Sequence, residues 1–329
     1  MFDGKKVLIT GGTGSLGTAL TKKLLETNVN TIRIFSRDEL KQMKMEDQLK
    51  NKKLRFLIGD VRDKERLTRA MEDIDIVFHT AALKHVPVAE YNPFEAIKTN
   101  VLGTQNVIDS SLDNNVKLVL AVGTDKAVSP LNTYGATKLL MERMITSANF
   151  SKGKHKTNFL CVRYGNVLGS RGSVLPKFLE QIKNNQGLTI TDPKMTRFNI
   201  TMNQAIELIL RAVKFGMGGE IFVPKLKAYT VGDLKNAVME LKNYNVKTQK
   251  IPIRQGEKSH EILINQDEIP YTYESKDDYI IMINGVENLS SRKNKNIKKI
   301  NFSKTYSSDT APLLSKNEIK KTILNENLL

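Results

Sequence analysis

The chain has 329 residues, of which 40% are hydrophobic and 26% are charged. These values fit a soluble globular protein large enough for two lobes, and no apolar run approaches the ~20 residues that a membrane-spanning helix needs. The formal net charge of +16 allows anionic partners. Because the basic residues are spread along the chain, we expect neither a nucleic acid nor a membrane as a partner. The single cysteine, Cys161, excludes an internal disulfide framework and favours a reducing cytoplasm.

A strand, a glycine-rich turn and a helix open the chain. The apolar run from Val7 to Thr10 reads as a parallel strand, and Gly11, Gly14 and Gly17 follow it at three-residue spacing. Gly11 permits a tight turn, Gly14 lets a pyrophosphate approach the backbone, and Gly17 lets the helix pack closely on the strand. The stretch therefore predicts a dinucleotide-binding loop, and we assign its remaining contacts to Thr13, Ser15 and Leu16.

The ends of the next two strands indicate which dinucleotide is bound. The second strand ends at Ser36 and Arg37, where an NAD-specific site usually carries a carboxylate. An arginine there can pair with a ribose 2′-phosphate, so we favour NADP. NAD stays open, because Asp38 follows immediately. The third strand ends at Asp60 and Val61, where we place the adenine edge.

Small residues follow the fourth strand, which runs from Ile74 to His79. Ala81 and Ala82 leave room for the ribose and phosphates of the cofactor, and Lys84 can reach the substrate or a phosphate. The segment 92–114 then reads as one long helix that carries Asn100.

The stretch with the densest set of reactive side chains follows the fifth strand, which ends at Gly123. Thr124, Asp125 and Lys126 come first, and Tyr134 and Lys138 lie on the helix that begins next. Tyr134 and Lys138 are four residues apart, so both project from one helix face. A cation beside a phenol lowers the phenol's pKa, which makes Tyr134 a candidate base for a sugar or alcohol hydroxyl. Thr124 is placed to hold the same oxygen.

Strands alternate with helices at regular spacing up to the sixth strand, in the segment 158–170, which we expect to leave the sheet. That alternation predicts an α/β fold with a doubly wound parallel Rossmann sheet. We assign residues 1–165 to it and expect 200–228 to return to it. Segments 166–199 and 229–329 are expected to form a smaller, discontinuous α+β lobe. No metal-ligand spacing occurs, so we expect no metal.

Three motifs resemble the extended short-chain dehydrogenase/reductase superfamily. They are GGTGSLG, the Thr124, Tyr134 and Lys138 set, and RYGNVLG. Five blocks narrow the resemblance: IFSRDE, AALKHVP, TDKAVSPLNTYGATK, TDPKMTRFNIT and RQGEKSHEIL. Together they resemble the inverting UDP-N-acetylglucosamine 4,6-dehydratases that open the pseudaminic acid pathway.

The resemblance implies a reaction and a role for each site residue. Tyr134 would take the proton of the sugar 4-OH, Asp125 would protonate the departing 6-OH, and Lys126 would remove the C5 proton. Lys126 must be neutral to act as a base, so we expect burial and a nearby cation to depress its pKa. The product would be UDP-2-acetamido-2,6-dideoxy-β-L-arabino-hex-4-ulose. UDP-N-acetylglucosamine would be the substrate, NADP the cofactor, and a homo-oligomer, dimer or hexamer, the assembly. The resemblance assigns substrate contacts to Lys84, Thr124, Lys126, Asn166, Arg197, Arg254 and Glu257, and further cofactor contacts to Asn100, Val167, Tyr134 and Lys138.

Two other activities on the same scaffold remain open from the sequence. They are a UDP-hexose 4-epimerase and a retaining 4,6-dehydratase. Epimerisation at C4 needs no acid/base pair beyond Tyr134, whereas elimination needs both an acid and a base beside C5 and C6. Retaining dehydratases commonly carry Asp-Glu where this chain has Asp125-Lys126, so the pair favours the inverting branch. A non-enzymatic NADP-binding or nucleic-acid-binding protein is the alternative from another class.

Overall fold

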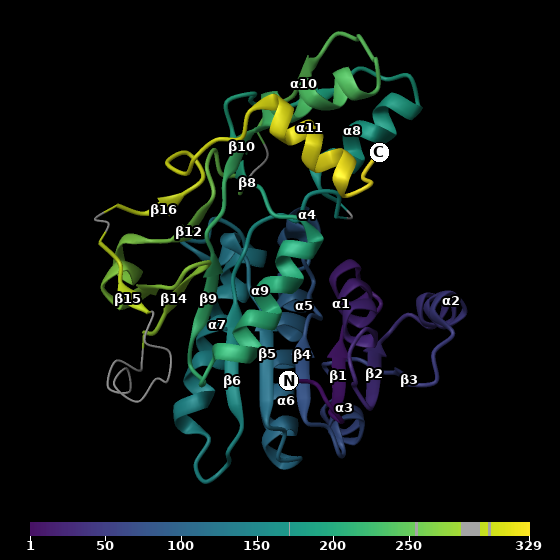
Figure 1. Ribbon diagram of the computed structural model, residues 1–329, viewed down its shortest axis with the longest axis vertical. Coiled ribbons are helices and arrows are strands. Elements are labelled where there is room, and N and C mark those ends of the chain that lie inside the picture. Colours follow the sequence, from purple (N-terminus) through teal and green to yellow (C-terminus); the bar gives the residue numbers. More distant parts are fainter. Residues whose placement is uncertain (171, 254–255, 284–296, 302–303) are drawn as a thin grey trace.

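The protein has a large twisted sheet with helices on both faces and a smaller lobe above the ends of its strands (Figure 1). The computed structural model describes residues 1–170, 172–253, 256–283, 297–301 and 304–329. Within these residues the main sheet has ten strands in the order β15-β13-β14-β9-β6-β5-β4-β1-β2-β3. The N-terminus lies beside the sheet and the C-terminus lies in the smaller lobe.

The parallel part of the sheet has the strand order of a doubly wound fold. Seven strands share one direction. In spatial order they are β3 (Leu54–Ile58), β2 (Thr31–Ser36), β1 (Lys6–Thr10), β4 (Ile76–His79), β5 (Leu118–Val122), β6 (Asn158–Val162) and β9 (Ile221–Pro224). The central strands are apolar along their length because helices cover both faces, as parallel sheets require. The predicted Rossmann sheet is confirmed.

Helices cover the two faces as the alternation of strands and helices predicts. On one face α1 (Ser15–Leu25) lies beside α9 (Met202–Phe215), and α2 (Glu39–Leu49) packs on β2 and β3. On the other face α6 (Gly103–Asp113) lies between α3 (Lys64–Met71) and α7 (Thr133–Ser151). In the described part of the chain, no helix is both long and apolar enough to cross a bilayer.

The sheet continues beyond the predicted parallel strands, which corrects two expectations. The sixth strand does not leave the sheet, since β6 lies between β5 and β9. Part of the segment 229–329 also joins the sheet: β14 (Asp278–Ile281) pairs antiparallel with β9, followed by β13 (Thr272–Glu274) and β15 (Lys298–Lys299). Without β14, the backbone N–H and C=O groups on one side of β9 would lack strand partners.

The single long helix expected over 92–114 is confirmed as a continuous helical run from Pro93 to Asp113, made of α5 (Pro93–Ile97), the π-helical turn η1 (Lys98–Leu102) and α6. A short separate helix, α4 (Val86–Tyr91), precedes it. The side chain of Asn100, inside the π-turn, accepts a hydrogen bond from the Leu83 N–H at 2.8 Å and donates to the Leu83 carbonyl at 3.0 Å. The π-turn thus presents a buried amide that fixes the loop after β4. Single π-turns of this kind are frequent at functional sites.

The smaller lobe has a hydrophobic core of its own. Leu175, Phe178, Leu234 and Ile323 are fully buried there between three helices. The helices are α8 (Val174–Lys183), α10 (Val231–Leu241) and α11 (Lys316–Asn325), and α11 begins with a capping box of Ser315 and Glu318. Three strand pairs complete the lobe: β7 (Thr189–Ile190) with β11 (Gln249–Lys250), β8 (Thr196–Phe198) with β10 (Ala228–Thr230), and β12 (Ile262–Ile264) with β16 (Tyr306–Ser307).

A buried ion cluster joins the sheet to the segment that carries β12. Arg163 follows β6 directly and is 0% exposed. Its guanidinium donates to the carboxylate of Glu142 on α7 and to that of Glu268 in the 3-10 turn η3 (Gln266–Tyr271), with shortest distances of 2.7 and 2.8 Å. It also donates to the Leu263 carbonyl of β12 at 2.9 Å. One side chain therefore fixes α7, β6 and β12 relative to one another.

Candidate active site

A cavity of about 870 Å³ lies where the parallel strands end and the smaller lobe begins. Ligands of doubly wound sheets bind at this edge. Twenty-one residues assigned to a site from the sequence line this cavity. They are Gly11, Thr13, Gly14, Ser15, Leu16, Gly17, Ser36, Arg37, Asp60, Val61, Ala81, Ala82, Lys84, Thr124, Lys126, Tyr134, Lys138, Asn166, Val167, Arg197 and Glu257.

The glycine-rich loop has the tight geometry that its sequence predicts. Gly11 has a φ of +66°, and a Cβ atom there would lie 2.8 Å from the backbone of Ala81. A Cβ atom on Gly17 would lie 2.6 Å from the backbone of Gly12. The loop leads into α1, which begins at Ser15 with Gly14 as its N-cap. The free N–H groups and the dipole of that helix end favour a diphosphate.

Two cations lie at the end of the cavity beside β2. Arg37 and Lys41 both line it. The Asp38 carboxylate caps α2 by accepting the Lys41 N–H at 3.0 Å, so it is engaged with the helix. A guanidinium nitrogen of Arg37 lies 3.6 Å from Asp60, whose carboxylate also accepts from Arg62 at 2.7 Å. Burial alone would raise the pKa of Asp60, but its contacts with Arg62 and Arg37 hold it below its usual value.

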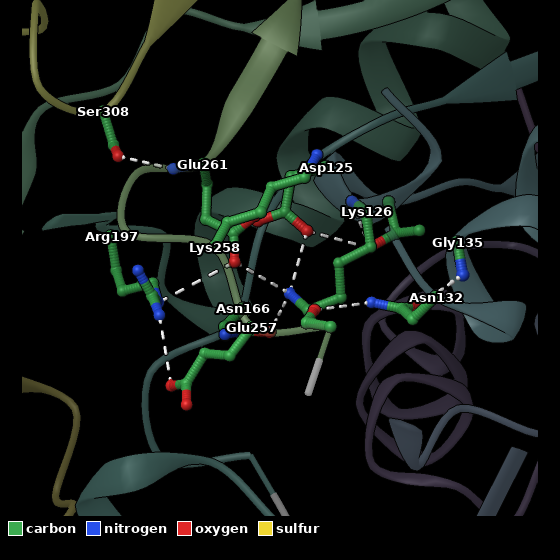
Figure 2. Close-up of polar contacts among 12 residues, drawn as sticks. Asp125, Lys126, Asn132, Gly135, Asn166, Arg197, Glu257, Lys258, Glu261 and Ser308 are labelled. Carbon is green, nitrogen blue, oxygen red and sulfur yellow. Dashed lines mark hydrogen bonds and ion pairs between the residues drawn. The ribbon is translucent and has the colours of Figure 1, made fainter. Parts of the chain in front are cut away.

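Lys126 is the centre of a polar cluster on the 3-10 turn η2 (Asp125–Ala127), directly after β5 (Figure 2). Its Nζ atom donates to Asp125 at 3.1 Å, to Asn166 at 3.2 Å and to Glu261 at 3.4 Å. Thr124 donates to the same Asp125 oxygen at 3.0 Å. Residues from β5, the loop after β6 and the segment before β12 therefore meet at one ammonium group.

Asp125 lies beneath this cluster and does not line the cavity, since its side chain is 1% exposed. Burial and the neighbouring carboxylate of Glu261 raise its pKa, and the contacts with Lys126 and Thr124 offset only part of that rise. A carboxyl group with a raised pKa retains a proton that it can donate. Proton donation is the role that the sequence assigned to Asp125.

The pKa of Lys126 corrects an expectation from the sequence. We expected burial and a nearby cation to depress it and yield a neutral amine. Burial does lower the pKa of Lys126, but Asp125 and Glu261 together outweigh burial and raise it above its usual value. Two carboxylates within hydrogen-bonding reach stabilise the ammonium form. Lys126 is therefore protonated until its proton moves elsewhere.

Tyr134 and Lys138 both line the cavity from α7, but the cation that acts on Tyr134 is a different one. Burial raises the pKa of Tyr134, and Lys126 and a hydrogen bond with Thr124 only partly oppose it. The lowered phenol pKa that we expected from Lys138 is therefore wrong. The Lys138 ammonium instead donates to the Val122 carbonyl at 2.6 Å. Burial lowers the pKa of Lys138 to about 8, although Cys161 and Glu142 oppose the shift.

Arg197, on β8, faces the cluster from the smaller lobe. It donates to the Thr196 carbonyl at 2.8 Å and to Glu257 at 3.4 Å, and its Nε atom lies 3.7 Å from Glu261. Glu257 and Arg197 thus come together at the cavity wall. Arg254, which the resemblance also assigned to the substrate, lies outside the described residues.

Asn100 needs to be removed from the residues assigned to the site from the sequence, and Glu261 needs to be added to them. Asn100 does not line the cavity, because its side chain is 1% exposed and holds Leu83 and Thr137. Glu261, in contrast, was given no role from the sequence, although it lines the cavity and contacts Lys126. The available signal was its place in the block RQGEKSHEIL, and nothing in that block indicates which distant residue it meets.

The sheet order and the set of Thr124, Tyr134 and Lys138 define a Rossmann-type protein of the extended short-chain dehydrogenase/reductase class. Residues 7–283 match the model of a family described as polysaccharide biosynthesis protein. The chain belongs to that family.

Three curated relatives with different names show what the chain is similar to. An inverting UDP-N-acetylglucosamine 4,6-dehydratase of Campylobacter jejuni is 50% identical over 85% of this chain and 84% of its own length. An uncharacterized membrane protein of Methanocaldococcus jannaschii is 47% identical over 98% of this chain and 96% of its own length. A UDP-glucose 4-epimerase of Rickettsia bellii is 42% identical over 99% of this chain and 97% of its own length. The resemblance to inverting dehydratases that the sequence indicated is thereby confirmed.

A solved structure has the same fold along the whole chain. The X-ray structure of Pen from Bacillus thuringiensis is 44% identical, and the match covers 100% of both chains with a TM-score of 0.94. The fold described above, including the smaller lobe, therefore matches that of a solved structure.

Proposed function

We propose that the protein is an inverting UDP-N-acetylglucosamine 4,6-dehydratase, a lyase that uses NADP. The observation that carries this proposal is the acid/base cluster beside Tyr134. Asp125 and Lys126 lie 3.1 Å apart at the end of β5, and Lys126 and Tyr134 line the same cavity as the glycine-rich loop. Elimination of water across C5 and C6 needs such a pair. The Campylobacter relative of that name supports the same reaction.

The residues of the chain have separate tasks in this reaction. A bound nicotinamide dinucleotide supplies reversible hydride transfer. Tyr134 takes the proton of the sugar 4-OH, with Thr124 holding the same oxygen. The ketone at C4 acidifies the C5 proton, which Lys126 removes, while Asp125 protonates the departing 6-OH. Elimination leaves a double bond between C5 and C6. Return to C6 of the hydride taken from C4, with a proton added to the opposite face of C5, would give UDP-2-acetamido-2,6-dideoxy-β-L-arabino-hex-4-ulose.

The charges around the cavity support the choice of cofactor and the orientation of the substrate. Arg37 and Lys41 suit a ribose 2′-phosphate, which favours NADP over NAD. At the opposite end, Arg197 would bind the UDP diphosphate and Glu257 the uridine ribose. Lys84 and Asn166 would meet the sugar and phosphates between the two ends.

The biological setting is part of the proposal. The product would enter pseudaminic acid biosynthesis. The nucleotide-sugar substrate and the single buried cysteine suit a cytoplasmic enzyme. A homo-oligomer, dimer or hexamer, is the expected assembly.

A UDP-hexose 4-epimerase is the second candidate, and the Rickettsia relative bears such a name. An epimerase moves hydride and proton at C4 alone and has no use for an acid and a base beside C6. The Asp125–Lys126 cluster therefore favours dehydration. A retaining dehydratase would return the C5 proton to its original face, and the Asp125–Lys126 pair favours the inverting reaction over it.

Proton NMR of the purified protein with UDP-N-acetylglucosamine in deuterated buffer tests the proposal. NADP is withheld at first and added if nothing reacts. A new C6 methyl signal, deuterium at C5 and L-arabino couplings would establish inverting dehydration. A methyl signal with D-xylo couplings would indicate a retaining dehydratase, and a galacto product without a methyl would indicate an epimerase. No reaction with NADP present would refute the proposed substrate.

A further inference from the structure

Glu261 is a buried carboxylate for which the proposed reaction so far has no use. It is 3% exposed and immediately precedes β12. Ser308, beside β16, holds its backbone: the Glu261 N–H donates to the Ser308 Oγ at 2.9 Å, and its carbonyl accepts the Ser308 N–H at 2.8 Å. Its side chain points from this anchored position toward Lys126 and Arg197 (Figure 2).

The two oxygens of Glu261 differ in their surroundings. Oε1 accepts from Lys126 at 3.4 Å and lies 3.7 Å from the Arg197 Nε. Oε2 is buried and has no hydrogen-bond partner among the residues that the structure describes. A buried carboxylate oxygen without a donor is costly and is an open position for a proton. Glu261 is thus an acceptor in contact with the ammonium group that must lose a proton.

The charged and titratable groups around Glu261 come from three other parts of the fold and from its own segment. They are Asp125 and Lys126 on η2, Arg197 on β8, Tyr229 on β10, and Lys258 on the segment of Glu261 itself. Asp125 accepts from both Thr124 and Lys126 through one oxygen, Oδ1, and the proposed reaction requires its carboxyl group to hold a proton for the departing 6-OH. Of the two carboxylates that contact Lys126, Glu261 is therefore the one left to accept the proton of Lys126.

We propose that Glu261 is a positioning residue that takes the resting proton of Lys126 and so leaves its amine free to remove the C5 proton. In this step an N–H bond of Lys126 breaks and an O–H bond of Glu261 forms, and no proton enters or leaves the site. The amine then takes the C5 proton and becomes an ammonium again. The inference rests on the proposed function, in which Lys126 is the base.

Substrate binding favours the transfer of this proton to Glu261. Burial raises the pKa of Glu261, but Lys126, Arg197 and Lys258 together hold it below its usual value. A diphosphate bound to Arg197 offsets part of that positive charge and strengthens the proton affinity of Glu261. Substrate binding therefore lowers the cost of moving the proton from Lys126 to Glu261.

The transfer predicts a particular dependence on pH. Moving a proton from Lys126 to Glu261 leaves the number of bound protons unchanged, so the rate of C5 proton removal is independent of pH over the neutral range. In Glu261→Gln the proton of Lys126 must go to solvent, and the rate should then rise with pH. The slope approaches about tenfold per pH unit, because one proton must be lost.

The experiment measures deuterium entry at C5 of UDP-N-acetylglucosamine by NMR between about pH 6 and about pH 9. We expect a flat profile for the wild type. For Glu261→Gln we expect exchange at least about tenfold slower at the acidic end and a rate that climbs toward the wild-type value at the alkaline end. A uniform loss at every pH would show a purely structural role and overturn the inference. So would faster exchange than wild type at low pH, which would mean that the charge of Glu261 only restrains Lys126.

Two further variants make the result specific. Glu257→Gln removes a carboxylate from the same arginine without touching Lys126, so it should raise the KM and keep the flat profile. Glu261→Asp retains a carboxylate and should keep a flat profile at a lower rate, which serves as the test if the glutamine variant does not fold. A sloping profile for Glu261→Asp would contradict the inference. If the wild-type protein exchanges no C5 proton at all, the proposed function is refuted. If the wild type exchanges the C5 proton and Glu261→Gln has the same pH profile, only the role of Glu261 is refuted.

Discussion

Replacing Arg163 with methionine would remove the cation that contacts the buried carboxylates of both Glu142 and Glu268. Arg163 is 0% exposed, and Glu142 and Glu268 are 1% and 3% exposed. The methionine side chain can occupy much of the same volume, but it offers no donor to either carboxylate or to the Leu263 carbonyl. Both acids would have to stay buried without a cationic partner, or take up a proton.

The expected loss of stability is large. Removing one partner of a buried ion pair costs about 3–5 kcal/mol, and here one arginine serves two acids. Free energies of unfolding are about 5–15 kcal/mol, so Arg163→Met should lose about a fifth or more of the total. The loss should also depend on pH. Burial alone would raise the pKa of Glu268, but Arg163 outweighs burial and holds that pKa below its usual value. The stability that this ion pair contributes is therefore present above the pKa of Glu268 in the unfolded chain and is lost as pH falls. The deficit of the variant should therefore shrink on acidification.

Urea unfolding monitored by circular dichroism measures this loss. Arg69→Met is a matched control, because Arg69 pairs with Glu72 while its side chain is 74% exposed, and the free energy of unfolding should hardly change. Adding Glu142→Gln and Glu268→Gln to Arg163→Met should recover part of the loss, since a buried amide costs less than a buried charge. A loss below about 1 kcal/mol for Arg163→Met, or a deficit that grows toward acid pH, would refute the reasoning.

Three substitutions test the proposed roles at the cavity. Tyr134→Phe should abolish turnover, because the proton-accepting oxygen is lost. NADP binding, measured by fluorescence titration, should stay within about twofold of wild type. Near-normal turnover would exclude Tyr134 as the base. Lys126→Ala should stop deuterium entry at C5 and leave the circular dichroism spectrum unchanged, and undiminished exchange would contradict its role. Arg37→Asp should weaken NADP binding by about tenfold or more relative to NAD, since a carboxylate repels a 2′-phosphate; an unaltered preference would show that Lys41 or the backbone selects the cofactor.

Features encoded within a short stretch could be predicted from the sequence. The strand, the three glycines and the helix from Val7 to Leu25 are consecutive, so backbone sterics and helix periodicity determine the loop locally. The same holds for Tyr134 and Lys138, whose four-residue spacing places both on the cavity side of α7. The parallel sheet followed from the regular alternation of elements, because a parallel pair needs a crossover helix.

The protonation of the site could not be predicted in the same way. Lys126 and Glu261 are 135 residues apart in the sequence, yet 3.4 Å separates their charged atoms. A pKa depends on which charges lie within a few ångströms and on how much water is excluded, and neither is a property of a local motif. The expectation of a neutral Lys126 was wrong for this reason.

The sequence by itself determined the dinucleotide loop, the helix with Tyr134 and Lys138, the parallel Rossmann sheet and the family. Tertiary structure alone decided that β14 and β13 extend the sheet, that Asn100 holds a loop, and that Arg163 and Glu261 are buried against acids and bases from distant segments. The physical reason is the range of the interactions. Backbone sterics and side-chain periodicity act over a few residues, whereas burial and Coulomb energy depend on distances through space that only the packed chain sets.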